Sequence, residues 1–135
     1  MGSRAAKILT VLFFVFVLVV IYWASSGRMP VFFQRLYRFP GGDKLAHFLL
    51  VGSLALLVNL ALGRRMLTVG RRRFLTGSVL VAAFISLEEV SQFAFPLRTP
   101  DVWDWAAGMA GILLAGRLTG YISFWRTSVR RPPQA

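Results

Sequence analysis

Four long apolar segments most constrain what this chain can fold into. They cover residues 8–27, 45–63, 74–95 and 102–124, and few charged residues interrupt them. An α-helix needs about 20 apolar residues to cross a hydrocarbon core of about 30 Å. Hydrophobic residues make up 56% of the chain, more than a soluble core of this size uses. The sequence therefore predicts an all-α integral membrane protein, a four-transmembrane-helix bundle that forms a single domain over residues 1–135.

The first apolar segment also has features of a signal peptide, because Arg4 and Lys7 precede it and small residues follow it. However, its uncharged run over residues 8–23 is longer than the h-region of a signal peptide, which has about 7–15 residues. We therefore interpret this segment as a membrane anchor.

Basic residues predict the orientation of the bundle, because the cytoplasmic loops of membrane proteins are enriched in lysine and arginine. Eleven of the 16 basic residues fall on one side of a four-span arrangement. These are Arg4, Lys7, Arg64, Arg65, Arg71, Arg72, Arg73, Arg117, Arg126, Arg130 and Arg131. The other side receives the remaining basic residues and all five acids. We therefore expect both termini to be cytoplasmic, with membrane lipids as the immediate partners.

The net charge of +11 does not indicate nucleic-acid binding, because the basic residues flank apolar runs instead of forming a soluble basic face. No nucleic acid is therefore expected as a partner. The chain has no cysteine, which excludes a disulfide framework and thiolate chemistry.

The segment between the first two apolar runs, SSGRMPVFFQRLYRFPGGDK, is the long first outer loop and alternates aromatic and basic residues. Two interpretations fit it: a short interfacial helix, or an irregular loop with anchoring aromatics. The apolar side of such a helix would contain Phe32, Phe33, Leu36 and Tyr37. Pro40-Gly41-Gly42 then predicts a turn. We expect Asp43 to cap the next helix, because its carboxylate can accept hydrogen bonds from the free N–H groups of the first turn.

Polar residues gather at the expected outer ends of the last three helices. Asp43 and His47 are four residues apart, so they share one face of the second helix. Glu88 and Glu89 lie near the end of the third helix, where an ionisable side chain needs a partner or a wet cavity, and Glu89 is the better site candidate. The residues expected to meet in one polar site are Asp43, Lys44, His47, Glu89, Gln92, Arg98 and Asp104.

Each of these residues also has a purely structural interpretation. Asp43 and Asp101 stand next to helix starts and are suited to capping them. Lys44 suits an anchor at the membrane surface. Arg98 is suited to neutralising buried acid, and we expect its charge partner to be Glu89.

Small residues follow Asp104 along the fourth helix at three- and four-residue spacing, as Gly108, Gly111 and Ala115. Small residues let membrane helices approach each other closely. The spacing therefore predicts that a neighbouring helix packs tightly against the fourth one.

The polar residues form a set of short motifs in a fixed order. They read Asp43-Lys44-Leu45-Ala46-His47, Glu89-Val90-Ser91-Gln92, Pro96-Leu97-Arg98 and Asp104, with Gly111 seven residues further on. In these motifs the chain resembles the VanZ-like family of small bacterial membrane proteins, over residues 43–116. One departure is Gly108, where the family usually has asparagine, so a polar contact of the family is missing here or is supplied by another residue.

The resemblance implies a multi-pass protein of the bacterial cytoplasmic (inner) membrane. It also implies a connection with resistance to teicoplanin, a glycopeptide antibiotic that acts on extracytoplasmic cell-wall precursors. An outer position of the polar site agrees with such a target.

Two functions fit this site. In the first, the protein is a hydrolase or transferase acting on a lipid-linked or amphipathic cell-envelope substrate, such as a lipid-linked cell-wall precursor. His47 is then the general acid or base, and Glu89 and Asp104 orient it or activate water. The expected substrate-binding residues are Asp43, Lys44, Gln92 and Arg98.

In the second function, the protein is a non-catalytic binder or accessory protein that holds a headgroup, a glycopeptide or a partner protein in the same pocket. No cofactor is expected. A divalent metal held by His47 and carboxylates is the alternative, although this mixed ligand set specifies no particular metal. Proton-coupled transport requires polar residues deeper in the bundle, where Asn59 is the main candidate.

Overall fold

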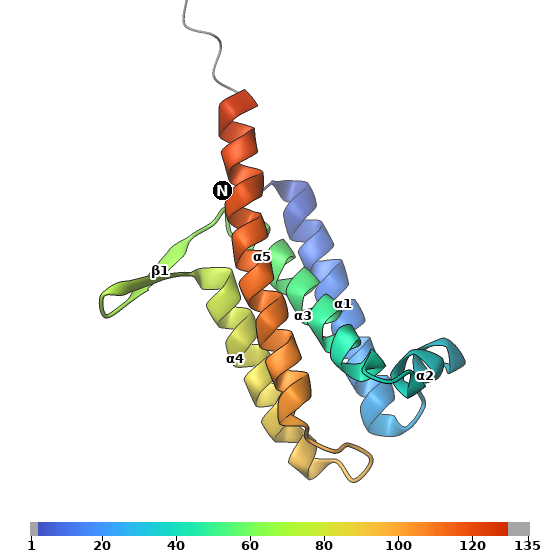
Figure 1. The fold of residues 1–135 in the computed structure, drawn as a ribbon. Helices are drawn as coiled ribbons and strands as arrows, with labels where there is room; N and C mark the ends of the chain where they lie inside the picture. The colour runs from blue at the N-terminus through green and yellow to red at the C-terminus, as the bar shows by residue number, and fades with distance from the viewer. Residues whose placement is uncertain (1–2, 130–135) are drawn as a thin grey trace, which may run out of the picture.

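The structure is a computed structural model in which residues 3–129 are described, and it is mostly helical (Figure 1). Its elements are α1 (Arg4–Ser26), α2 (Val31–Arg38), α3 (Gly42–Ala61), β1 (Met66–Val69), β2 (Arg72–Leu75), α4 (Thr76–Ser91), the 3-10 turn η1 (Gln92–Ala94) and α5 (Val102–Val129). Four helices are long and apolar enough to cross a membrane, namely α1, α3, α4 with η1, and α5. The prediction of four such helices is confirmed. Arg130 and Arg131, used above to predict the orientation, lie outside the described residues.

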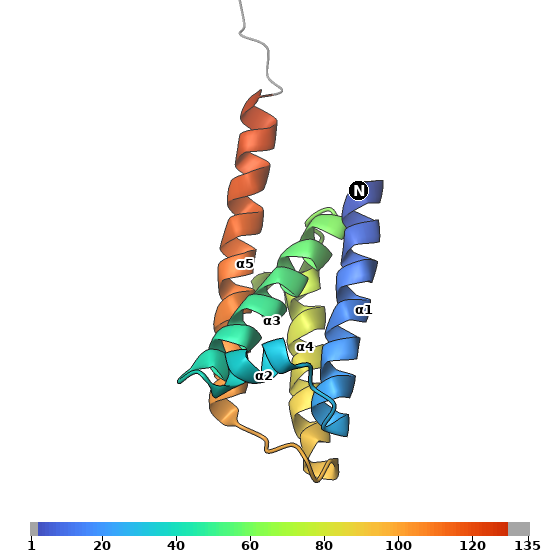
Figure 2. The same cartoon turned by 90° about the vertical axis from the view of Figure 1, so that its right-hand side faces the viewer.

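The segment before α3 forms the short helix α2, so the helical one of the two interpretations is correct. Phe33 packs on α1, with its ring centroid 6.4 Å from that of Phe16 and 6.1 Å from that of Trp23. Phe32, by contrast, is 74% exposed. Figures 1 and 2 show α2 lying across one end of the bundle instead of along it. One wall of that end is therefore built by α2.

The start of α3 differs from the prediction. Gly41 is its N-cap, in the left-handed conformation with φ of +75°, and Asp43 lies inside the first turn. A side chain on Gly42 would overlap the carbonyl oxygen of Leu36, so the two glycines let the chain reverse directly from α2 into α3. The predicted capping role of Asp43 is therefore wrong. Asp101 does cap α5, because its Oδ1 accepts the backbone N–H of Trp103 at 2.8 Å.

The basic segment between α3 and α4, expected to be a plain loop, contains an antiparallel hairpin of β1 and β2. Its strands pair from Met66 opposite Leu75 to Val69 opposite Arg72. Gly70 takes a positive φ of +61° at the first position of the two-residue turn, a position that favours glycine. The fold therefore departs from an all-α architecture at this one place within residues 3–129.

Close packing of α3 against α5 holds the bundle together. The two helices meet at Gly52 and Gly111, where a side chain on Gly111 would overlap the carbonyl oxygen of Phe48 and lie 3.0 Å from the amide nitrogen of Gly52. This contact confirms the close packing expected from the small residues of the fourth span. The apolar core beside it comes from α3, α4 and α5 and comprises Val51, Leu54, Ala55, Val81, Ile85, Ile112 and Ala115.

Replacing Gly111 with alanine should lower the thermal stability of the protein in detergent, because the new methyl group would push α3 and α5 apart. Overpacking of this kind costs about 1–3 kcal/mol. Gly120→Ala is the matched control, since it lies on the same helix and a Cβ there has nothing within 4 Å. The control should be neutral or slightly stabilised by alanine's better helix propensity. Equal melting temperatures for the two variants would show that the helix contact has room for a side chain.

Candidate functional site

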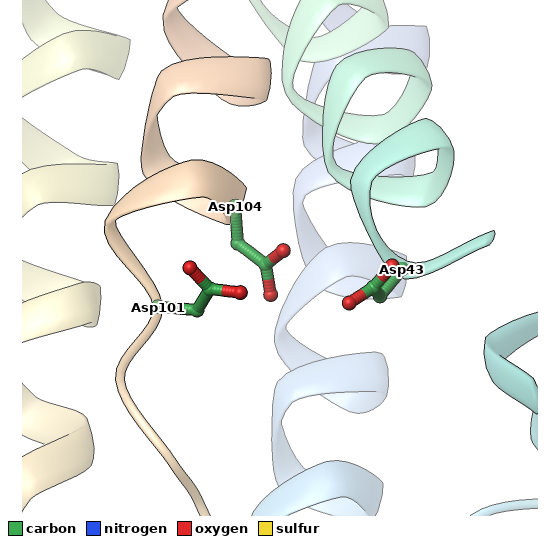
Figure 3. Close-up of side chains that lie close together, drawn as sticks. All are labelled: Asp43, Asp101 and Asp104. Atoms are coloured by element: carbon green, nitrogen blue, oxygen red, sulfur yellow. The ribbon is translucent and has the colours of Figure 1, made fainter. Parts of the chain in front are cut away.

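The ammonium group of Lys44 lies among three carboxylates at one end of the bundle. Its Nζ is 3.0 Å from Asp43 Oδ2, 3.1 Å from Asp101 Oδ2 and 3.2 Å from Asp104 Oδ1. Figure 3 shows these aspartates: Asp43 comes from the start of α3, and Asp101 and Asp104 come from the start of α5, with the carboxylates turned toward one another. Lys44 therefore joins the beginnings of two helices that are far apart in the sequence.

The same three carboxylates have the chemistry of a cation site. One oxygen from each lies within 4.8 Å of the others, and carboxylate oxygens are the ligands that hard divalent cations prefer. In the structure, the positive charge beside the three carboxylates comes from the Lys44 ammonium. The pKa of Asp101 is held below its ordinary value of 3.8, first by the Trp103 backbone N–H and then by Lys44. Lys44 was expected to hold substrate, whereas its contacts in the structure are to these carboxylates.

His47 is held by a backbone group. Its Nδ1 lies 2.9 Å from the carbonyl oxygen of Asp43, one turn earlier on α3. Because a carbonyl oxygen can only accept, Nδ1 carries the proton in the neutral imidazole, and Nε2 of that tautomer has a free lone pair. Asp104 Oδ2 is 3.7 Å from the same Nδ1, near enough to stabilise a positive charge on the ring. Within residues 3–129, Nε2 makes no hydrogen bond.

Arg98 pairs with Glu88 and not with Glu89, so the predicted charge pair is wrong. The distance from Arg98 Nη2 to Glu88 Oε1 is 3.0 Å, and the two side chains are only 13% and 15% exposed. Glu89 instead accepts the backbone N–H of Asp101 at 2.7 Å through its Oε1. The loop after η1 therefore contacts α4 at two neighbouring residues. Arg98 bonds to Glu88, and the main chain of Asp101 bonds to Glu89.

Gln92, three and four residues after the two glutamates, connects them. Its Nε2 donates to Glu88 Oε2 at 3.0 Å and to Glu89 Oε2 at 3.3 Å. The Gln92 side chain is buried, at 4% exposure of the residue. It therefore fixes the orientation of both carboxylates.

Two adjoining spaces lie beside these residues. The inner cavity, of about 60 Å³, lies among α1, α3, α4 and α5. Apolar side chains form much of its wall, among them Val17, Val20, Phe84 and Ile85. The outer space, of about 470 Å³, is an open vestibule lined largely by polar groups. Five residues line both spaces and so mark their boundary: Ala24, Tyr37, His47, Arg98 and Asp104.

The expected site residues divide between these spaces. His47, Arg98 and Asp104 line both, as stated above. Glu89 lines only the inner cavity, while Asp43 and Gln92 line only the vestibule. Lys44 lines neither space.

Tyr37 is a residue of this site that the sequence did not single out. It reaches the boundary of the two spaces from α2, a helix whose existence was itself uncertain from the sequence. Burial raises the pKa of its phenol above 10.0, although nearby Arg98 acts in the opposite direction. The phenol therefore stays neutral at physiological pH and offers an O–H donor to a bound anion. Only the fold, and not the spacing of residues, places it there.

Gly108, the departure from the family motif, also lines the inner cavity. A Cβ at this position would lie 3.0 Å from Ile85 Cδ1 and 3.4 Å from Val51 Cγ2. These two apolar side chains occupy the space that a larger residue would need. The wall is therefore apolar at this position.

Comparison of the chain with known protein families, with curated proteins and with solved structures gives no match. The resemblance to the VanZ-like family therefore rests on the motifs of the sequence.

A double-mutant cycle tests the pairing of Arg98. Arg98→Met alone leaves Glu88 without its cation in a buried position, and removing one partner of a buried pair costs about 3–5 kcal/mol. The double variant Arg98→Met/Glu88→Gln should recover part of this loss, as measured by thermal unfolding in detergent. Glu89→Gln is the matched control, because its amide oxygen can still accept the Asp101 N–H. Stronger coupling of Arg98 to Glu89 than to Glu88 would contradict the observed pair.

Proposed function

We propose that the chain is a multi-pass protein of the bacterial cytoplasmic membrane that acts on an amphipathic, anionic substrate of the cell envelope. The reaction is a hydrolysis or a group transfer at the extracytoplasmic end of the bundle. One observation carries this proposal: an apolar cavity among four spanning helices adjoins an open polar vestibule, and His47 lies at their boundary. The motif resemblance to the VanZ-like family connects the substrate with the precursors that teicoplanin targets.

The two volumes suggest how such a substrate is divided. Ligand pockets usually measure about 300–1,000 Å³, and the vestibule of about 470 Å³ falls in this range. The inner cavity, of about 60 Å³, is far smaller than this range. A polar headgroup therefore occupies the vestibule, and only a small apolar part adjacent to it enters the inner cavity.

The donors at the boundary suit an anionic headgroup. Arg98 keeps N–H groups beyond those bonded to Glu88 and Ser25, because a guanidinium has five donors in a fixed fork. Tyr37, which lines the same space, adds a neutral O–H. Together they bind phosphate or carboxylate oxygens next to His47.

The proposed chemistry centres on His47. Nε2 accepts the proton of a water or hydroxyl group as its oxygen attacks the phosphoryl or carbonyl centre, and the ring then donates that proton to the leaving oxygen. Asp104 stabilises the imidazolium formed in between. Glu89 acts indirectly, because it holds the main chain of Asp101 and so positions the start of α5 that carries Asp104.

A second function, non-catalytic binding of a headgroup, a glycopeptide or a partner protein, is favoured by a different observation. Each of the five carboxylates at this end already accepts a hydrogen bond from Lys44, Arg98, Gln92 or a backbone N–H. Such fully paired acids are suited to holding a rigid binding surface. Replacing His47 therefore distinguishes the two functions, because catalysis requires its Nε2 and binding does not.

The test uses purified protein and a polyprenyl diphosphate, a probe that combines an apolar chain with phosphates. His47→Ala should lower phosphate release at least a hundredfold, because general acid–base catalysis contributes about 10²–10⁴-fold, while binding changes only a few-fold. Phe32→Ala, at a residue outside both spaces, is the control and should retain full activity. Full turnover by a folded His47→Ala protein would remove the enzyme proposal. Binding by the wild type without any release would support the binder instead.

The orientation, with both termini cytoplasmic, is part of the proposal and is supported by the basic residues that flank the spans. The absence of cysteine allows two single-cysteine variants to test it. In spheroplasts, Phe32→Cys should react with a membrane-impermeant maleimide, while Arg71→Cys should react only after permeabilisation. A cytoplasmic reporter fused to Ala135 should also be active. The reverse labelling pattern would place the site on the cytoplasmic side.

A further inference from the structure

The hairpin of β1 and β2 stands where a membrane surface would lie. It connects the end of α3 to the start of α4, and both of these helices have the length and apolarity of membrane spans. Figure 1 shows the hairpin extending sideways from the bundle, away from the direction of the helices. An element in this place runs along the membrane instead of reaching straight out into water.

The two faces of the hairpin differ in character. Residues paired across an antiparallel hairpin lie on the same face, so Leu67 and Phe74 share a face with Val69 and Arg72. The three apolar side chains of this face are 41%, 43% and 56% exposed for Leu67, Phe74 and Val69 respectively. The other face carries Thr68 opposite Arg73 near the turn, and Met66 opposite Leu75 where the hairpin joins the bundle. Toward the turn, one face is therefore mainly apolar and about half exposed, while the other face is polar there.

The charge of this region has one sign. Arg64, Arg65, Arg71, Arg72 and Arg73 lie in or beside the hairpin, and none of them forms an ion pair with the residues that the structure describes. No acid occurs between Asp43 and Glu88 in the sequence. All five acids of the chain lie at the opposite end of the bundle. Any anion that these arginines bind must therefore come from outside the described residues.

We propose that the hairpin is a binding site for anionic phospholipid headgroups. Its apolar face enters the boundary between headgroups and acyl chains, and its arginines bind the phosphates of the same leaflet. Amphipathic elements with this composition bind membranes through apolar burial combined with attraction to anionic lipids. The strands pair the backbone groups that face each other, and the groups on their two outer edges can bond to water and headgroups at the interface. This site is separate from the cavity and does not depend on the chemistry proposed there.

Spin labels on adjacent residues test the proposal. Single-cysteine variants Val69→Cys and Thr68→Cys, which lie on opposite faces, are labelled with a nitroxide in nanodiscs containing phosphatidylglycerol and phosphatidylcholine. The label at position 69 should collide at least threefold more with oxygen, relative to a water-soluble nickel chelate, than the label at position 68. In phosphatidylcholine alone this ratio should fall toward one.

The arginines are tested in the same assay. Arg71→Gln/Arg72→Gln/Arg73→Gln should lose the difference between the labels at positions 69 and 68 in anionic nanodiscs. The control variant Arg28→Gln/Arg35→Gln, at the opposite end of the bundle, should keep that difference. Unchanged thermal unfolding shows that each variant is folded. Equal, high exposure of both labels to nickel would overturn the proposal and place the hairpin in water. A difference that is the same in neutral and anionic nanodiscs would remove the headgroup specificity.

Discussion

The contact of one lysine with three aspartates determines the geometry of the polar end of this protein. Lys44 joins the start of α3 to the start of α5, and the loop before α5 is in turn fastened to α4 by Glu89 and Arg98. His47 takes its orientation from the same first turn of α3. The positions of the site residues therefore depend on one cation that compensates several acids near a membrane, where an unpaired carboxylate would be costly.

Much of this architecture could be predicted from the sequence, because hydrophobic length and small-residue spacing act locally. The four spans and the close approach at Gly111 are examples. The hairpin was missed because its short strands are interrupted by arginines, which in membrane proteins usually indicate a plain cytoplasmic loop. Gly70 was the one local signal for a turn there.

The details of the site were less predictable. Glu88 and Glu89 are adjacent, and which of them meets Arg98 depends on the path of the chain after η1, over the ten residues from Glu88 to Arg98. No spacing rule decides that. Asp43 had the residue type of a cap, but the left-handed Gly41 caps α3 two residues earlier. The contribution of Tyr37 depends on how α2 packs across the bundle, which is a tertiary property.

The separation of charge along the bundle has an electrical consequence. Every acid lies at the end that holds Lys44, whereas the arginines of the hairpin lie at the other. In the proposed orientation the basic end faces the negative side of the membrane potential, where each elementary charge moved across 100 mV is worth about 2.3 kcal/mol. The resting voltage of the cell then opposes inversion of the protein, and loss of that voltage during insertion would weaken the preference for one topology.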